Sequence, residues 1–117
     1  MQNDYKNLIV WQKSMELVVE VYGLTSKYPG NELYGLVSQS RRCGVSVPSN
    51  IAEGKRRGTD NELRRFLLIS FGSGAELETQ IEIAKRLPFG KYLNFKKVDE
   101  LLEEVMKMLN KIISNLE

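Results

Sequence analysis

Apolar residues recur every three or four positions along most of the chain, which is the spacing of amphipathic helices. The first run predicts a helix over residues 8–27, ended by Pro29-Gly30. A second run predicts a helix from the candidate N-cap Asn31 to about Arg57, with Gly58 at its C-terminal end. The expected buried seam of the first helix is Leu8, Trp11, Met15, Val18, Tyr22 and Thr25. That of the second is Leu33, Leu36, Ser40, Gly44, Val47 and Ile51, whose small members permit close helix approach.

Two further helices follow from the same pattern. Thr59 and Glu62 have the spacing of a capping box, which predicts a helix start there, and Pro88-Phe89-Gly90 ends that helix. The last helix is expected from near Asn94, with an apolar seam of strict heptad spacing. Pro48 lies inside the second helix, where its missing N–H should bend that helix or break it in two.

The helices together predict the fold class. No segment alternates between apolar and polar residues with turn signals at both ends, so a sheet is not expected. The chain has 117 residues, of which 42% are hydrophobic, and that is enough for one core. We therefore expect an all-α protein, a single domain over residues 1–117 folded as an antiparallel up-down-up-down four-helix bundle.

The last helix carries more apolar residues than one seam requires. Leu101, Met106, Met108 and Ile113 lie beside the heptad seam and widen the apolar stripe. A monomer was not expected to cover so wide a stripe, so Leu101, Met106 and Ile113 are the predicted oligomer interface.

Composition narrows the chemistry. The chain contains no histidine, which excludes Ser-His-Asp and Cys-His catalysis and His-ligated metal sites. No catalytic residue, metal or cofactor is therefore expected. The single cysteine, Cys43, is interpreted as a small buried thiol. No secretory signal and no apolar run long enough to span a membrane is present, which makes a cytoplasmic protein the default expectation.

The cations are unevenly placed. Six of the seven arginines fall between positions 41 and 65, whereas nine of the ten lysines lie elsewhere. An antiparallel hairpin would bring the end of the second helix beside the start of the third, at one pole of the bundle. The candidate nucleic-acid-binding residues are Lys55, Arg56, Arg57, Arg64, Arg65 and Arg41. A solvated helix end whose cations answer the helix dipole explains the first three equally well, but it does not explain Arg64 and Arg65.

A polar stripe runs along the second helix. Its members are Arg42, Ser46, Asn50, Glu53 and Arg57, and Glu76 on the third helix is placed to pair with Arg42 or Arg41. Two interpretations remain open for the stripe, a layer of structural hydrogen bonds between helices or part of a binding surface.

The segment LVSQSRRCGVSVPSNIAEG, residues 36–54, resembles the S23-like family of four-helix-bundle proteins encoded by intervening sequences in bacterial 23S ribosomal RNA genes. That family shows Gln-x-Arg-Arg followed by Ser-Ile/Val-x-x-Asn-Ile-Ala-Glu-Gly, here residues 39–42 and 46–54. Its later Arg-Phe-Leu and Gly-Ser-x-x-Glu-Leu elements correspond to residues 65–67 and 72–77, and the run at 8–11 also fits. Cys43 and Gly44 depart from it, since the family more often has alanines there.

The resemblance implies a four-helix bundle, often assembled as a homopentamer. It also implies kinship with the accessory variability protein of diversity-generating retroelements, a basic pentameric barrel that binds nucleic acid and a reverse transcriptase. For most members of the intervening-sequence family the function is unknown.

These observations favour a non-enzymatic, oligomeric protein that binds nucleic acid, RNA more than DNA, or a nucleoprotein. No aromatic residue lies between Lys55 and Arg65, so binding is expected to be driven by backbone charge and not by base sequence. The alternative is a protein-interaction adaptor, for example for a polymerase or reverse transcriptase, without direct contact to nucleic acid. An enzyme, the third reading, would need a base other than histidine.

Overall fold

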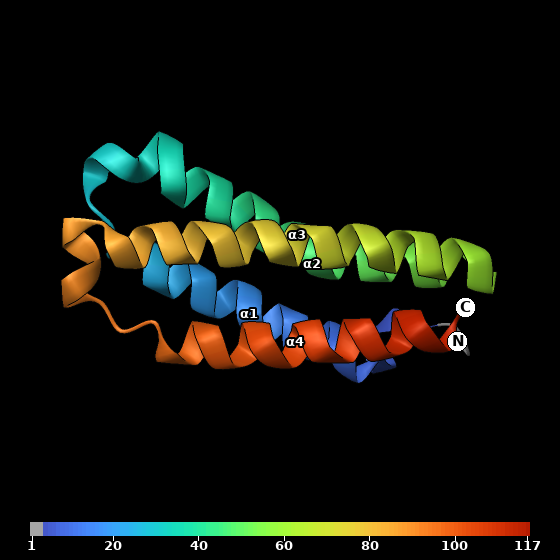
Figure 1. The fold of residues 1–117 in the computed structure, drawn as a ribbon. Helices are drawn as coiled ribbons and strands as arrows, with labels where there is room; N and C mark the ends of the chain where they lie inside the picture. The colour runs from blue at the N-terminus through green and yellow to red at the C-terminus, as the bar shows by residue number, and fades with distance from the viewer. Residues whose placement is uncertain (1–3) are drawn as a thin grey trace.

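The computed structural model describes residues 4–117, which contain four α-helices and no strand. They are α1 (Ile9–Thr25), α2 (Ser38–Arg57), α3 (Asp60–Arg86) and α4 (Lys96–Asn115). Short helical turns occupy Tyr5–Asn7, Gly30–Glu32, Leu33–Val37 and Pro88–Tyr92. Successive helices run in opposite directions along an elongated bundle of 45 × 23 × 19 Å (Figure 1). The expected all-α, antiparallel four-helix bundle is confirmed.

All four helices contribute to one apolar core, whose burial is the main stabilising contribution to the fold. Its fully buried members include Leu17, Val21, Val47, Ile51, Leu67, Leu77, Ile81, Val105 and Leu109. The turn at 88–92 and the residues just before α4 close the end of the bundle opposite the chain termini (Figure 1).

The buried face of α1 differs from the expected seam. Val10, Ser14, Leu17, Val21 and Leu24 are buried together with Thr25, whereas Met15 and Tyr22 are exposed. The expected seam was correct for Thr25, and Leu8 and Trp11 pack against the core, but it was wrong for Met15 and Tyr22. Helix α1 has apolar residues on more than one side, and the periodicity alone does not say which side meets the neighbouring helices.

Helix α2 begins later in the chain than predicted. Residues 30–37 form a 3-10 turn and a π-helical turn, and regular α-helix starts only at Ser38. Gly35 has non-helical dihedral angles of φ −107° and ψ −110°. Glu32, and not the expected Asn31, caps the π-helical turn, since its Oε1 accepts a hydrogen bond of 3.3 Å from the Leu36 amide.

Helix α2 is continuous across Pro48, so the proline does not break it. The first half of α2 slopes across α3 and its second half runs beside it, which is the change of direction that a proline produces (Figure 1). Ser70 on α3 donates a 2.8 Å hydrogen bond to the Val47 carbonyl next to the proline. Further along, Gly54 lies so close to Leu63 and Phe66 that a Cβ there would be 2.7 Å from the Cβ of Phe66.

The start of α3 is capped as predicted, with the Thr59 hydroxyl accepting from the Glu62 amide at 3.2 Å. The second half of the capping box does not form, because the Glu62 carboxylate accepts from Arg65 Nε at 2.8 Å. The helix ends at Arg86, just before the Pro88–Tyr92 turn, as expected.

The apolar stripe of α4 is covered within one chain. Leu101 and Ile113 are buried, with 4% and 7% of their surfaces exposed, and Met106 packs against Gly74 of α3. The expectation that Leu101, Met106 and Ile113 form an exposed oligomer interface was therefore wrong. The small residue on α3 lets α4 approach closely enough for its neighbours to cover a wide stripe.

Candidate nucleic-acid interface

The turn between α2 and α3 gathers five cations at one end of the bundle. Gly58 has φ 87°, a left-handed conformation that glycine adopts without a Cβ clash, and it reverses the chain after Arg57. This basic pole, as it is called below, comprises Lys55, Arg56, Arg57, Arg64 and Arg65. It lies at the end of the molecule that also holds both chain termini (Figure 1).

Aromatic rings support three of these arginines. The guanidinium carbon atoms of Arg57 and Arg65 lie 4.9 and 4.5 Å from the ring centre of Phe66. That of Arg56 lies 5.2 Å from the ring centre of Tyr5. Stacking of this kind holds a guanidinium group in place, so less conformational entropy is lost when it binds an anion.

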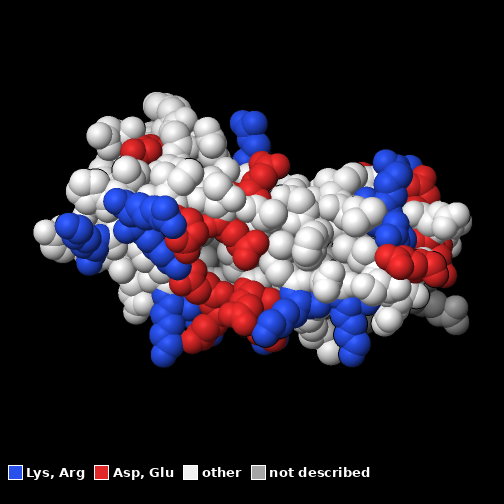
Figure 2. Space-filling view, in the orientation of Figure 1, with Lys and Arg blue, Asp and Glu red and all other residues white. Residues whose placement is uncertain are grey.

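Three carboxylates lie beside the cations of the pole. Arg65 pairs with Glu62 at 2.8 Å, Arg64 with Glu117 at 3.2 Å, and Arg57 more loosely with Glu53 at 3.9 Å. The hydrogen bond from Arg65 lowers the pKa of Glu62 below its ordinary value. Among the described residues, no carboxylate oxygen lies within 4.0 Å of the charged nitrogens of Lys55 or Arg56. Figure 2 shows cations and carboxylates side by side at this end.

Arg41 is not part of the pole. It lies near the start of α2, sixteen residues before Arg57, a helix length of about 24 Å. Its Nε donates to Thr25 Oγ1 at 3.0 Å and its Nη2 to the Tyr22 carbonyl at 3.4 Å. Arg41 therefore lies apart from the other five candidate nucleic-acid-binding residues, because the length of α2 separates them.

The residues of the polar stripe on α2 have different environments in the structure. Ser46 and Ser73 share a 2.8 Å hydrogen bond between α2 and α3, and the Asn50 amide donates to both the carbonyl and the hydroxyl of Ser46. These half-buried residues tie the two helices together. Arg42 is exposed and the expected pair with Glu76 does not form in the described part of the chain, where Glu76 instead accepts from the Cys43 thiol at 3.4 Å.

Cys43 is buried, as expected. Burial raises the pKa of its thiol, while a hydrogen bond from Gln80 acts in the opposite direction. A buried neutral thiol is a poor nucleophile, which fits a packing role.

Three residues that contact the basic pole were not expected to belong to a site. Tyr5 and Glu117 are far from the α2–α3 turn in sequence, so no local pattern connects them with it. Phe66 is buried, and its position directly after Arg65 was the signal in the sequence that could have identified it.

The face formed by α3 and α4 has the opposite charge. Glu78, Glu82, Asp99 and Glu103 line a hollow in which Lys85 is the one cation. Lys85 Nζ donates to Asp99 at 2.7 Å, and this bond raises the pKa of Lys85. Figure 2 shows the acidic area between the two helices. Four carboxylates beside one lysine make this face unfavourable for a polyanion.

Two general features of residues 4–117 complete the site description. They contain no cluster of three or more potential ligands placed to hold a metal ion. None of their helices is both long and apolar enough to span a membrane.

The sequence and fold can be compared with known proteins. No curated protein matches the chain. Its structure is similar to the crystal structure of a protein of unknown function from the S23 ribosomal protein family of Bacteroides thetaiotaomicron, with a TM-score of 0.76, 25% sequence identity, and coverage of 90% of this chain and 98% of that one. Residues 6–111, which include α1, α2, α3, most of α4 and the basic pole, match the profile described as 23S rRNA-intervening sequence protein, and the chain therefore belongs to that family.

Proposed function

We propose that this protein is a non-enzymatic, oligomeric, cytoplasmic protein that binds structured RNA, or an RNA–protein complex, through the basic pole. The observation that carries the proposal is the group of four arginines at the α2–α3 turn, three of them stacked on Phe66 or Tyr5. Guanidinium groups in fixed positions suit the geometry of phosphate oxygens.

The carboxylates of the pole reduce its positive charge but do not block it. The Glu53, Glu62 and Glu117 pairs are largely exposed to solvent, and exposed ion pairs contribute only about 0.2–1 kcal/mol each. A phosphate that accepts two hydrogen bonds from an arginine can therefore displace such a partner. The modest net charge indicates weak binding by a single copy.

Self-association compensates for weak individual contacts. Several copies that present the pole in one direction raise the effective affinity without a new contact, provided that all reach the same RNA. The family resemblance supports a homopentamer, and the proposed kinship with the retroelement accessory variability protein supports nucleic acid as the ligand. Since the stripe on α4 is buried, we place the contact between copies on α1, where Met15 and Val19 are exposed.

The test is RNA binding across a salt series. Replacing Arg56, Arg57, Arg64 and Arg65 with Gln should weaken binding by a similar factor for unrelated RNA sequences. It should also flatten the plot of log affinity against log salt, because each lost phosphate contact removes about 0.7–0.9 from the slope. The control replaces Lys91, Lys96, Lys107 and Lys111 with Gln, the same change in charge outside the pole.

The result also decides between the two functional classes. If the quadruple arginine variant remains folded and binds RNA with unchanged affinity and slope, the pole is not the RNA site. A wild-type protein without affinity for RNA at low salt would favour the adaptor hypothesis instead.

A further inference from the structure

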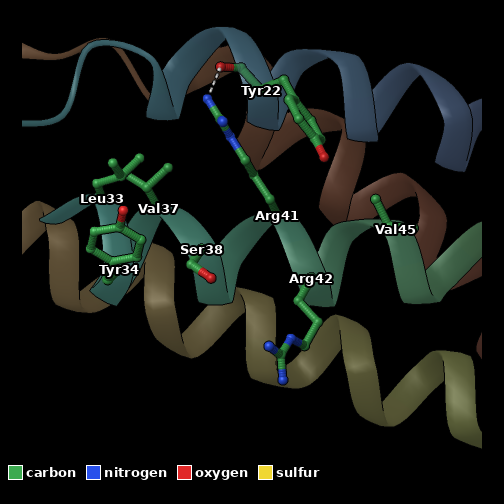
Figure 3. Close-up of a pocket in the computed structure, with 8 residues that line it drawn as sticks. All are labelled: Tyr22, Leu33, Tyr34, Val37, Ser38, Arg41, Arg42 and Val45. Atoms are coloured by element: carbon green, nitrogen blue, oxygen red, sulfur yellow. Dashed lines mark hydrogen bonds between the residues drawn. The ribbon is translucent and has the colours of Figure 1, made fainter.

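A groove on the outer surface of α2 has features that the basic pole lacks. It is an open groove of about 540 Å³ near the start of the helix. Its lining consists of Tyr22, Leu33, Tyr34, Val37, Ser38, Arg41, Arg42 and Val45 (Figure 3). No acidic residue is among them, unlike the hollow between α3 and α4.

Aromatic and aliphatic side chains are exposed in this groove. Tyr34, on the π-helical turn before α2, has 90% of its surface exposed, and Leu33 beside it has 49% exposed. In Figure 3 they stand at one end of the groove, and Tyr22 of α1 lies at its side. A tyrosine that is almost fully exposed has no packing role within the chain, whereas its ring is suited to stack on a planar ligand.

The two arginines of the groove provide charge on both of its sides. Arg41 reaches toward α1, where it is held by Thr25 and the Tyr22 carbonyl and lies 4.5 Å from the centre of the Tyr22 ring. Arg42 points in the opposite direction, over α3 (Figure 3). Neither is within 4.0 Å of a carboxylate among residues 4–117, in contrast to Arg57, Arg64 and Arg65.

We propose that this groove binds one unpaired nucleotide of an RNA, with the base against Tyr34 and the phosphate at Arg42. Tyr34 and Arg42 stand apart along the groove (Figure 3), and an exposed ring together with an uncompensated guanidinium matches a ligand that is both planar and anionic. The inference rests on the proposed function and extends it, because it adds a contact to a base at a distance from the pole.

The distance between the two sites defines the RNA that reaches both. Arg42 precedes Arg57 by fifteen residues of helix, or about 22 Å. A single strand stacked with the helical rise of about 3.4 Å per nucleotide spans this distance in roughly seven nucleotides, and an extended strand spans it in fewer. An RNA hairpin held at the pole therefore reaches the groove through a single-stranded tail of that length or shorter.

The experiment measures affinity for an RNA hairpin with and without a tail of about ten nucleotides. The tail should raise the affinity of the wild-type protein about tenfold, the usual contribution of one stacked base. Tyr34→Ala, Arg42→Gln and the double variant should each lose most of this gain and keep the affinity for the blunt hairpin. Tyr92→Ala and Lys111→Gln are matched controls, since Tyr92 is 89% exposed and lies outside the groove.

The outcomes separate the two proposals. If the tail gives no gain, or if the variants keep the gain, the groove does not bind RNA, whatever the pole does. If the wild type binds the tail alone but not the blunt hairpin, the proposal for the groove is supported and the proposal for the pole is wrong. If the wild type binds neither RNA, both proposals are wrong. The single variants are surface substitutions, so they still decide the question if the double variant does not fold.

Discussion

Individual residues of the basic pole have different neighbours, and these decide how available each one is. Lys55 and Arg56 have no carboxylate within reach among the described residues, whereas Arg64 is held by Glu117 from the last position of the chain. Glu53, Glu62 and Glu117 lie beside the cations of the pole and reduce its excess of positive charge.

At the scale of the residue we predict that Glu117→Gln strengthens RNA binding. The substitution frees the Arg64 guanidinium from its 3.2 Å contact, and an exposed pair of this kind is worth up to about 1 kcal/mol, or about fivefold in affinity. Filter binding at low salt measures the effect. Glu103→Gln is the control, since it makes the same change in charge at the Lys107 pair on α4. An equal gain in both variants would show a general effect of net charge and not one of Arg64.

At the scale of the element, the bundle depends on close approach between α2 and α3. Gly54 is the tightest point, where a Cβ would lie 2.7 Å from Phe66 Cβ and 3.3 Å from the Leu63 carbonyl. Neither the Leu63 backbone nor the Phe66 Cβ moves easily to make room for an added methyl group. Gly23 inside α1 is different, because apart from the neighbouring residues and backbone of its own helix no atom lies within 4 Å of the Cβ position there.

The two glycines therefore give opposite predictions. Gly54→Ala should lower the free energy of unfolding by about 1–3 kcal/mol, because the added methyl group overpacks the helix contact. Gly23→Ala should raise it by about 0.5–1 kcal/mol, because alanine restricts the unfolded chain and fits the helix. Urea denaturation followed by circular dichroism measures both. A stabilised Gly54→Ala protein would contradict the close approach of the helices.

At the scale of the whole molecule, the large apolar residues that are exposed among the described ones lie on α1, α2, α3 and the connecting turns, and none of them lies on α4. Val19 has 68% and Met15 39% of its surface exposed, and both line a hollow of about 340 Å³ toward α4. Tyr22, which lines the α2 groove, follows Met15 by seven residues and therefore lies further along the same face of α1. Apolar patches with polar rims are typical of interfaces.

We predict that Met15→Glu with Val19→Glu converts an oligomer into a helical monomer, because two buried charges are not tolerated in an apolar interface. Multi-angle light scattering at micromolar concentrations gives the mass of both proteins. Ile83→Glu, at a similarly exposed site on α3, is the control and should leave the mass unchanged. A monomeric wild type would refute self-association altogether.

The sequence alone determined those features whose causes are local. Thr59 caps α3 through an amide three residues away, Gly58 allows the left-handed turn before it, and Pro88 follows the end of α3. A short turn necessarily places Arg57 near Arg64, so most of the basic pole was predictable. The absence of histidine excluded its catalytic and metal chemistry without any structure.

Tertiary structure decided the features that depend on which other helix or chain segment packs against a residue. Both apolar sides of α1 have helical spacing, and only the positions of α2 and α4 determine that Leu17 is buried and Met15 exposed. Leu101 and Ile113 are covered because neighbouring helices approach α4 closely, which no pattern within α4 reveals. Glu117 and Tyr5 reach the pole for the same reason. Periodicity specifies which residues share a helix face, but only packing specifies what that face meets.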